Sequence, residues 1–275
     1  MSYRPRLSLQ ICLLLFAVAS TAASALPDAR GSDGASKARS DNAAVSKAQK
    51  AADLLQRAGN SYVKCHWNDC VTDANKAISM LPALSSGYYF SGMANGQMER
   101  YEQAIPMLTE YIQLVKDHVD SNTYVVRGEC YWALGDSKKA IADWTKGLAY
   151  APKSEVALTR RSEAYCELHQ FDKAIKDATA FVTYYPRLAR SYSFRGRILM
   201  AAGKNAESIA DFTKAISIEP DLPEPYGCRS QAYEKMGKFA LAAIDRQRCN
   251  VAAKRQTTVG SGKQSWMLQD SNLTH

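Results

Sequence analysis

Six cysteines after residue 25 are the side chains in this sequence that could take part in the widest range of chemistry. Two of them, Cys65 and Cys70, enclose the run Cys65-His66-Trp67-Asn68-Asp69-Cys70, and the others are Cys130, Cys166, Cys228 and Cys249. An even number of cysteines permits disulfides in an oxidising compartment, and a turn between Cys65 and Cys70 would bring their Cα atoms within bonding range. The run therefore makes Cys65 and Cys70 a candidate disulfide.

Metal binding and thiol redox catalysis are the other roles to weigh for this run. Cys65, His66, Asp69 and Cys70 lack the spacing of a zinc site, and the Cys-x-x-Cys-His motif of haem attachment is missing. The remaining cysteines fit small buried apolar positions. The sequence has no nucleophile elbow, Gly-rich phosphate loop or His-Glu-x-x-His helix. We therefore expect no metal, no cofactor and no enzyme, with thiol redox at Cys65 and Cys70 as the enzymatic alternative.

A second set of residues consists of oppositely charged side chains at regular spacing. Four arginines stand 34 residues apart, and an aspartate follows each after sixteen residues: Arg127, Arg161, Arg195 and Arg229, with Asp143, Asp177, Asp211 and Asp245. Arg57 and Asp73 keep the same separation, whereas Ser91 and Met107 replace both members in the segment between. Their joint absence predicts a structural ion-pair ladder, within one helical hairpin or between adjacent hairpins. The alternative is that duplicated repeats inherit both residues without pairing.

The elements that position these residues follow from the same period. A step of 34 residues indicates a helical hairpin that buries its apolar face by stacking on copies of itself. The repeats are 51–84, 85–118, 121–154, 155–188, 189–222 and 223–256, and only Val119 and Asp120 fall outside them. In most repeats a proline ends the second helix, and small residues recur where the two helices cross. The central part of the chain is therefore predicted to be an all-α array.

The repeated pattern resembles the tetratricopeptide repeat. It combines a small residue, an aromatic such as Tyr131 or Tyr165, a turn glycine such as Gly135, a second aromatic such as Phe171 and a terminal proline. The resemblance covers about three quarters of the chain. It implies a right-handed superhelical solenoid of about six helical hairpins.

In the family that this chain resembles, the first helices line a concave peptide-binding groove. The corresponding residues include Tyr89, Asn122, Glu129, Trp132, Glu163, Glu167, Arg197 and Met200. Apolar anchors thus stand beside acidic side chains, which favours a peptide partner with apolar and basic residues. The Lys and Asn pattern of family members that hold chaperone tails is absent. The alternative is that Trp132 and Met200 pack on neighbouring helices.

Both ends of the chain differ from the array. Residues 1–25 carry Arg4 and Arg6, an apolar run and the Ala23-Ser24-Ala25 form of a signal peptidase site. They predict a signal peptide and export to the periplasm or secreted space; the alternative is an uncleaved anchor, although the apolar run is shorter than the roughly 20 residues that span a bilayer. Residues 26–50 are predicted to be a flexible leader in which Asp41 caps the start of a helix, and 257–275 a disordered tail.

The charge balance narrows the class of partner. The chain has a net charge of +8, and loss of residues 1–25 leaves 33 Lys plus Arg against 27 Asp plus Glu, or +6. Basic residues crowd together only near the C-terminus, at Arg246, Arg248, Lys254, Arg255 and Lys263, where a solvated helix face explains them and contact with an anionic envelope surface is a minor role. Nucleic acid is not expected as a partner. The sequence predicts a protein or peptide binding scaffold, with a structural spacer or assembly subunit as the alternative.

Overall fold

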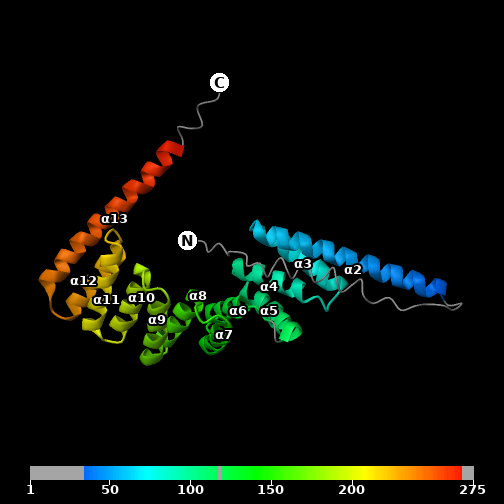
Figure 1. Ribbon diagram of the computed structural model, residues 1–275, viewed down its shortest axis with the longest axis horizontal. Helices are drawn as coiled ribbons and strands as arrows, with labels where there is room; N and C mark the ends of the chain where they lie inside the picture. Colours follow the sequence, from blue (N-terminus) through cyan, green and yellow to red (C-terminus); the bar gives the residue numbers. More distant parts are fainter. Residues whose placement is uncertain (1–33, 117–118, 268–275) are drawn as a thin grey trace, which may run out of the picture. The chain divides into compact units, whose positions relative to one another are not determined.

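The computed structural model describes the backbone of residues 34–116 and 119–267, and every regular element in these ranges is a helix (Figure 1). The predicted signal peptide and residues 26–33 lie outside the described residues. The helices are α2 (Gly34–Val63), α3 (Trp67–Met80), α4 (Ser85–Gln97), α5 (Tyr101–Val115), α6 (Ser121–Ala133), α7 (Ser137–Tyr150), α8 (Glu155–Glu167), α9 (Phe171–Tyr184), α10 (Ala189–Ala201), α11 (Asn205–Ile218), α12 (Pro223–Lys235) and α13 (Phe239–Met267).

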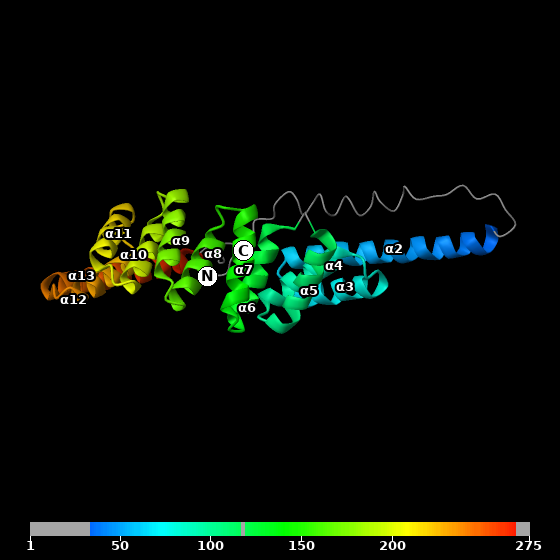
Figure 2. The same ribbon diagram turned by 90° about the horizontal axis from the view of Figure 1, so that it is seen from below.

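The contacts divide the chain into two compact units, Met1–Asp143 and Trp144–His275, with the boundary inside α7. In the first unit α2 packs against α3 and α4 against α5. In the second unit the pairs are α8 with α9, α10 with α11, and α12 with α13, as Figure 2 shows for α10 and α11. Each unit is therefore a stack of helical hairpins, as the repeat period predicts.

The turn inside every hairpin contains one residue with a left-handed backbone. Three of these residues are glycines, Gly135, Gly203 and Gly237, with φ between 71° and 82°. The other three hairpins use Cys65, Glu99 and His169 at the same repeat position, with φ between 54° and 59°. A left-handed residue lets the chain leave the first helix and enter the second within a few residues, and glycine adopts it with least strain.

Small residues hold the two helices of a hairpin close together. A Cβ atom on Gly92 of α4 would lie 2.6 Å from Cδ2 of Leu108, and a Cβ atom on Gly196 of α10 would lie 2.7 Å from the Phe212 ring. Ser162 occupies the same position in α8, and its hydroxyl donates a hydrogen bond of 2.8 Å to the carbonyl oxygen of Ala174. The hairpins are packed so tightly at these crossings that only the smallest side chains fit.

Aromatic and aliphatic side chains fill the space on either side of the crossings. In the first unit Tyr62, Phe90 and Leu108 belong to one continuous buried cluster. In the second unit the fully buried ring of Phe181 contacts Phe194 edge to face, with ring centroids 5.9 Å apart. These layers run along the stack because each hairpin covers the apolar side of its neighbour.

The structure corrects the predictions for the two flanking segments. A helix does begin within the predicted leader, but it begins at Gly34, before the predicted cap Asp41, so residues 34–40 are helical where a flexible segment was predicted. Its early residues include the good helix formers alanine, lysine and arginine, and no proline interrupts them. The last helix continues to Met267, through part of the predicted disordered tail, because Gly260 and Gly262 only weaken a helix whereas proline would end it. Residues 268–275 lie outside the described part.

None of the helices described between residues 34 and 267 combines the length and apolar character that crossing a bilayer requires. The predicted absence of a membrane span concerns the mature chain, and the uncleaved-anchor alternative concerns residues that the structure does not describe. Both therefore stay predictions.

The two residues outside the repeat period, buried Val119 and half-buried Asp120, form a junction before α6. Val119 is buried, and the carboxylate of Asp120 caps α6 by accepting a hydrogen bond of 3.4 Å from the backbone amide of Asn122. The Tyr89 hydroxyl also donates to Asp120. Burial raises the pKa of the Asp120 carboxyl above its ordinary value of 3.8, although these two hydrogen bonds partly oppose that rise.

This raised pKa makes the contribution of Asp120 to stability depend on pH. The folded state holds the Asp120 proton more tightly than the unfolded state, so stability falls as pH rises from about 3.8 through the folded pKa. Asp120→Asn keeps an acceptor for both donors and does not titrate. We expect the variant and the wild type to unfold alike at about pH 3 and the variant to be the more stable at about pH 7, measured by urea unfolding at each pH.

Asp136 supplies the control with the opposite sign. Hydrogen bonds from the Lys139 side chain and backbone amide lower the pKa of this exposed carboxyl. Asp136→Asn should therefore be the less stable protein at neutral pH, and the difference should vanish as pH falls through the lowered pKa. A stability difference between Asp120→Asn and wild type that does not change with pH would refute the role assigned to Asp120.

Candidate functional site

The arginine and aspartate series forms a regular set of ion pairs inside the hairpins. In α6 and α7, Nε of Arg127 donates to Oδ2 of Asp143 at 2.7 Å, and Nη2 donates to Oδ1 at 2.8 Å. The same two-bond geometry recurs at 2.7–2.9 Å between Arg161 and Asp177, Arg195 and Asp211, and Arg229 and Asp245. Parallel hydrogen bonds from a guanidinium to both carboxylate oxygens are the strong form of this interaction.

Each ladder arginine has a third nitrogen that is free to reach the preceding hairpin, and in three cases it does. Nη1 of Arg127 donates to Thr109, Nη1 of Arg161 to Thr145, and Nη1 of Arg229 to Thr213, each at 2.9 Å. Of the two arrangements left open by the sequence, the structure shows the ion pair within a hairpin. The ion pair lies within one hairpin, and the hydrogen bond to threonine joins that hairpin to the one before it.

These threonines were not predicted, although their regular spacing is visible in the sequence. Thr145, Thr179 and Thr213 stand 34 residues apart, and each lies sixteen residues before a ladder arginine. In the second hairpin, where the arginine is replaced, the hydroxyl of Ser91 donates at 2.8 Å to the side-chain oxygen of Asn75. Asn75 holds the threonine position of the first hairpin, so the link between hairpins is kept there without the ion pair.

The first hairpin shows what the preceding hairpin contributes. Arg57 lies 3.1 Å from Asp73, but its side chain is 68% exposed, whereas that of Arg161 is 17% exposed. The difference arises because the described chain places no second helix before α2 to cover Arg57. The outer side of α2 is correspondingly polar, with Asp53, Gln56 and Asn60 exposed to solvent.

A second group of charged residues connects the first helices of the second unit. Arg197 on α10 lies 3.6 Å from Glu163 on α8 and 3.3 Å from Glu224 on α12. Glu163 also pairs with Arg160 at 3.2 Å, and Arg190 on α10 pairs with Glu155 on α8. We call the side chains Glu163, Glu167, Arg197, Met200 and Glu224 the first-helix face of the second unit. Glu167 and Arg197 are exposed and Met200 is half-buried.

The predicted groove residues fall into two separate sets. Asn122, Glu129 and Trp132 lie on α6 of the first unit, where all three are half-buried. The second set lies in the second unit and consists of Glu163, Glu167, Arg197 and Met200. Glu163 is also less available than the sequence suggests, because it already contacts two arginines.

Tyr89 is not available to a ligand in this structure. Its side chain is only 8% exposed and packs in the core of the first unit, with ring centroids 5.6 Å from Phe90 and 5.2 Å from Tyr111. Burial raises its pKa well above 10.0, with the charge of Asp120 adding to the effect. The prediction that Tyr89 anchors a ligand is therefore wrong, because the residue fills the junction between hairpins.

The candidate disulfide is not formed. All six cysteines in the described residues are free, and Cys65 is exposed whereas Cys70 is buried. The left-handed turn residue Cys65 lies at the surface, while the thiol of Cys70 donates to the carbonyl oxygen of Phe90 at 3.7 Å. Burial raises the pKa of Cys70 to about 12, and nearby Asp73 adds to the rise. A redox nucleophile requires a lowered pKa, so this thiol is poorly suited to that chemistry.

Comparison with known proteins agrees with this architecture. A TPR repeat model matches residues 196–237, and a tetratricopeptide repeat model matches residues 121–154. Together with the stacked hairpins, these matches show that the chain is a tetratricopeptide-repeat protein. Proteins of this family are in general non-catalytic interaction scaffolds. No curated protein matches the chain.

Solved structures of other repeat proteins share the fold. MamA 41-end from Desulfovibrio magneticus RS-1 is 19% identical with a TM-score of 0.57, over 62% of this chain and 96% of that one. Another crystal structure of MamA is 19% identical with a TM-score of 0.55, over 61% and 96%. YrrB, described as "a TPR protein with an unusual peptide-binding site", is 16% identical with a TM-score of 0.58, over 69% and 94%. These similarities establish the fold.

Proposed function

We propose that this protein is a non-catalytic interaction scaffold that binds a peptide or protein segment on the first-helix face of the second unit. The observation that carries the proposal is the alignment of Glu163, Arg197 and Glu224 across three successive first helices, at separations of 3.3–3.6 Å. YrrB shows that a protein of this fold has a peptide-binding site. The preferred ligand combines apolar and basic residues.

The physical basis is an exchange of charged partners. Arg197 and Glu224 are 44% and 48% exposed, and ion pairs between such side chains contribute only about 0–1 kcal/mol. A lysine or arginine of a peptide can therefore replace Arg197 beside Glu163 or Glu224 at small cost. Met200 supplies adjacent apolar surface for a leucine-like side chain. Ionic contacts would set the orientation of the peptide, and the apolar contact would add affinity.

A binding assay with synthetic peptides tests this proposal. We expect a labelled short peptide of leucines flanked by lysines to bind the purified protein in fluorescence anisotropy. Glu163→Lys should weaken that binding about tenfold, because it places a like charge beside the ligand. Binding of the peptide with unchanged affinity to this variant would exclude the first-helix face as the site.

Glu207→Lys is the matched control. Glu207 lies on α11, a second helix, and its side chain is 62% exposed. The substitution changes net charge by the same amount as Glu163→Lys but leaves the first-helix face intact. Equal weakening by both variants would show that net charge, and not this face, determines binding.

The remaining alternatives make different predictions. As a structural spacer or assembly subunit, the protein would self-associate, and sedimentation velocity over a range of concentrations would detect this. For the redox alternative, the raised pKa of Cys70 argues against a thiolate, and thiol titration would test it.

We also propose that the protein acts in the cell envelope or the secreted space. Support for this location comes from the basic start, apolar run and small residues of segment 1–25. Mass spectrometry of the protein from its natural host should find an N-terminus at Leu26; an intact Met1 would contradict export by cleavage.

A further inference from the structure

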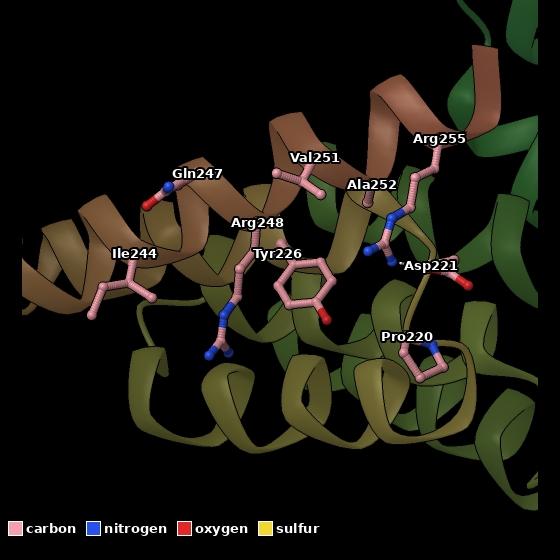
Figure 3. A pocket seen from close by; sticks show the side chains of 9 residues that line it. All are labelled: Pro220, Asp221, Tyr226, Ile244, Gln247, Arg248, Val251, Ala252 and Arg255. Carbon is pink, nitrogen blue, oxygen red and sulfur yellow. Dashed lines mark hydrogen bonds and ion pairs between the residues drawn. The ribbon is translucent and has the colours of Figure 1, made fainter. Parts of the chain in front are cut away.

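A cavity lies beside the last hairpin and shares no lining residue with the first-helix face. Its volume is about 390 Å³, and Figure 3 shows that α13 forms one side of it. The side chain of Tyr226 and the turn residue Pro220 form the opposite side, and Tyr226 is 9% exposed. Ile244, Val251 and Ala252 of α13 complete its apolar lining. The cavity therefore has an apolar part next to polar lining from Asp221, Gln247, Arg248 and Arg255.

Exposed apolar residues of α13, two of which line the cavity, depart from the repeat pattern. Leu241, Ile244 and Val251 are 44%, 48% and 45% exposed and recur at helical spacing on one side of α13. The residues 34 positions earlier on α11 are Glu207, Ala210 and Ser217. The same surface of the preceding hairpin is therefore polar or small, and burial of a neighbouring repeat does not explain the apolar residues of α13.

Two arginines give the cavity a positive charge. In Figure 3 the side chains of Arg248 and Arg255 extend from α13 on either side of the Tyr226 ring. Arg255 contacts the carboxylate of Asp221 at 3.1 Å, although both side chains are at least 70% exposed. No carboxylate of the described residues lies within ion-pair distance of Arg248. The only acidic residue on α13 between Phe239 and Arg255 is Asp245, which is already bound by Arg229.

From these observations we propose that the cavity between α12 and α13 binds an acidic peptide segment with an apolar side chain. The apolar side chain lies against Tyr226, Ile244 and Val251. A carboxylate next to it in the peptide accepts hydrogen bonds from Arg248, and a second one competes with Asp221 for Arg255. The site is separate from the first-helix face and has the opposite charge preference, so the scaffold holds two different segments at once.

The contact between Asp221 and Arg255 indicates the geometry of the bound carboxylate. It shows that a carboxylate beside Pro220 is placed to accept a hydrogen bond from Nη1 of Arg255. Guanidinium groups bind carboxylates in a directional way that a lysine ammonium does not reproduce. We therefore expect the site to prefer a carboxylate-bearing peptide over a ligand that presents only diffuse negative charge.

Fluorescence anisotropy with a labelled short peptide of leucines flanked by glutamates tests the proposal. We expect saturable binding that weakens as salt rises, and no binding when serine replaces leucine. When lysine replaces glutamate, the peptide becomes the probe of the first-helix face, and its binding should not depend on Arg248 or Val251. Arg248→Glu and Val251→Glu should each weaken binding about tenfold or more, which identifies the charged and the apolar parts of the site separately.

The repeat period supplies matched controls for both variants. Lys214→Glu and Ser217→Glu change the equivalent positions of α11, and both residues are exposed. They alter net charge as Arg248→Glu and Val251→Glu do, but they leave the cavity untouched. Equal weakening by a variant and its control would overturn the proposal, as would the absence of saturable binding. Circular dichroism would verify that each variant remains folded.

Vesicles distinguish a peptide site from a membrane surface. Sedimentation with vesicles containing phosphatidylserine should not depend on Arg248 and Val251 if the cavity recognises peptides. Strong vesicle binding that is lost in both variants, without binding of the leucine and glutamate peptide, would refute the peptide site and identify a lipid contact. Because the basic first-helix peptide serves as a second probe, failure at the α13 cavity is distinguishable from failure at the first-helix face.

Discussion

Asp177→Ala is expected to reduce the free energy of unfolding by about 3 kcal/mol, because it leaves the guanidinium of Arg161 without its carboxylate. Both members of this pair are shielded, with side chains that are 17% and 7% exposed, and they share two hydrogen bonds of 2.7–2.8 Å. Chemical denaturation followed by far-UV circular dichroism would measure the loss.

A double-mutant cycle isolates the pair from the effect of removing either side chain. Arg161→Ala combined with Asp177→Ala should cost much less than the two single losses together, because no unpaired charge remains buried. Arg57→Ala serves as the control and should cost about 1 kcal/mol or less, since its side chain is 68% exposed and its removal opens Asp73 to water. Additive effects of the two substitutions at Arg161 and Asp177 would show that they do not act as partners.

Gly92→Ala is expected to destabilise the first unit by about 1–3 kcal/mol through overpacking. The new Cβ atom would lie 2.6 Å from Cδ2 of Leu108 and 3.1 Å from its backbone nitrogen, and Leu108 is fully buried. The second helix of the hairpin must therefore move. The same denaturation experiment would detect a lower transition midpoint.

Gly227→Ala is the matched control and should change stability in the other direction. A Cβ atom there lies 3.5 Å from Sγ of Cys249, which is ordinary contact, and Gly227 is inside α12. Alanine in a helix interior is more favourable than glycine by about 0.5–1 kcal/mol. A stabilised Gly92→Ala variant would mean that the helices separate easily and that the small residue is not needed for their close approach.

The fold could be predicted well because each repeat carries the same signals for a helical hairpin. Helical spacing, the turn glycines and the charged pair recur with one period, so chance agreement at a single site matters little. The pairing of Arg161 with Asp177 was predictable from spacing and from joint replacement at Ser91 and Met107. Its burial was not, since burial depends on the hairpin that precedes each arginine.

The candidate site was harder to predict because the repeat period does not show whether a side chain is exposed or is buried by a neighbouring helix. Tyr89 has the expected position for a groove residue, yet its contacts with Phe90, Tyr111 and Asp120 place it in the core. Cys65 and Cys70 are close in sequence, but the left-handed turn places one at the surface and the helix crossing buries the other. For α13, comparison of each residue with its counterpart 34 positions earlier would have revealed the apolar replacements.

The two additional residues before α6 lengthen one connector without changing the contact between the hairpins that it joins. Arg127 reaches Thr109 across eighteen residues, whereas Arg161 and Arg229 reach their threonines across sixteen, and the donor distance is 2.9 Å in all three. Alignment of neighbouring hairpins is thus tolerant of connector length, because side chains and not the linking backbone define it. Insertions at these joints offer a route by which evolution or protein engineering can add new sequence without disturbing the stack.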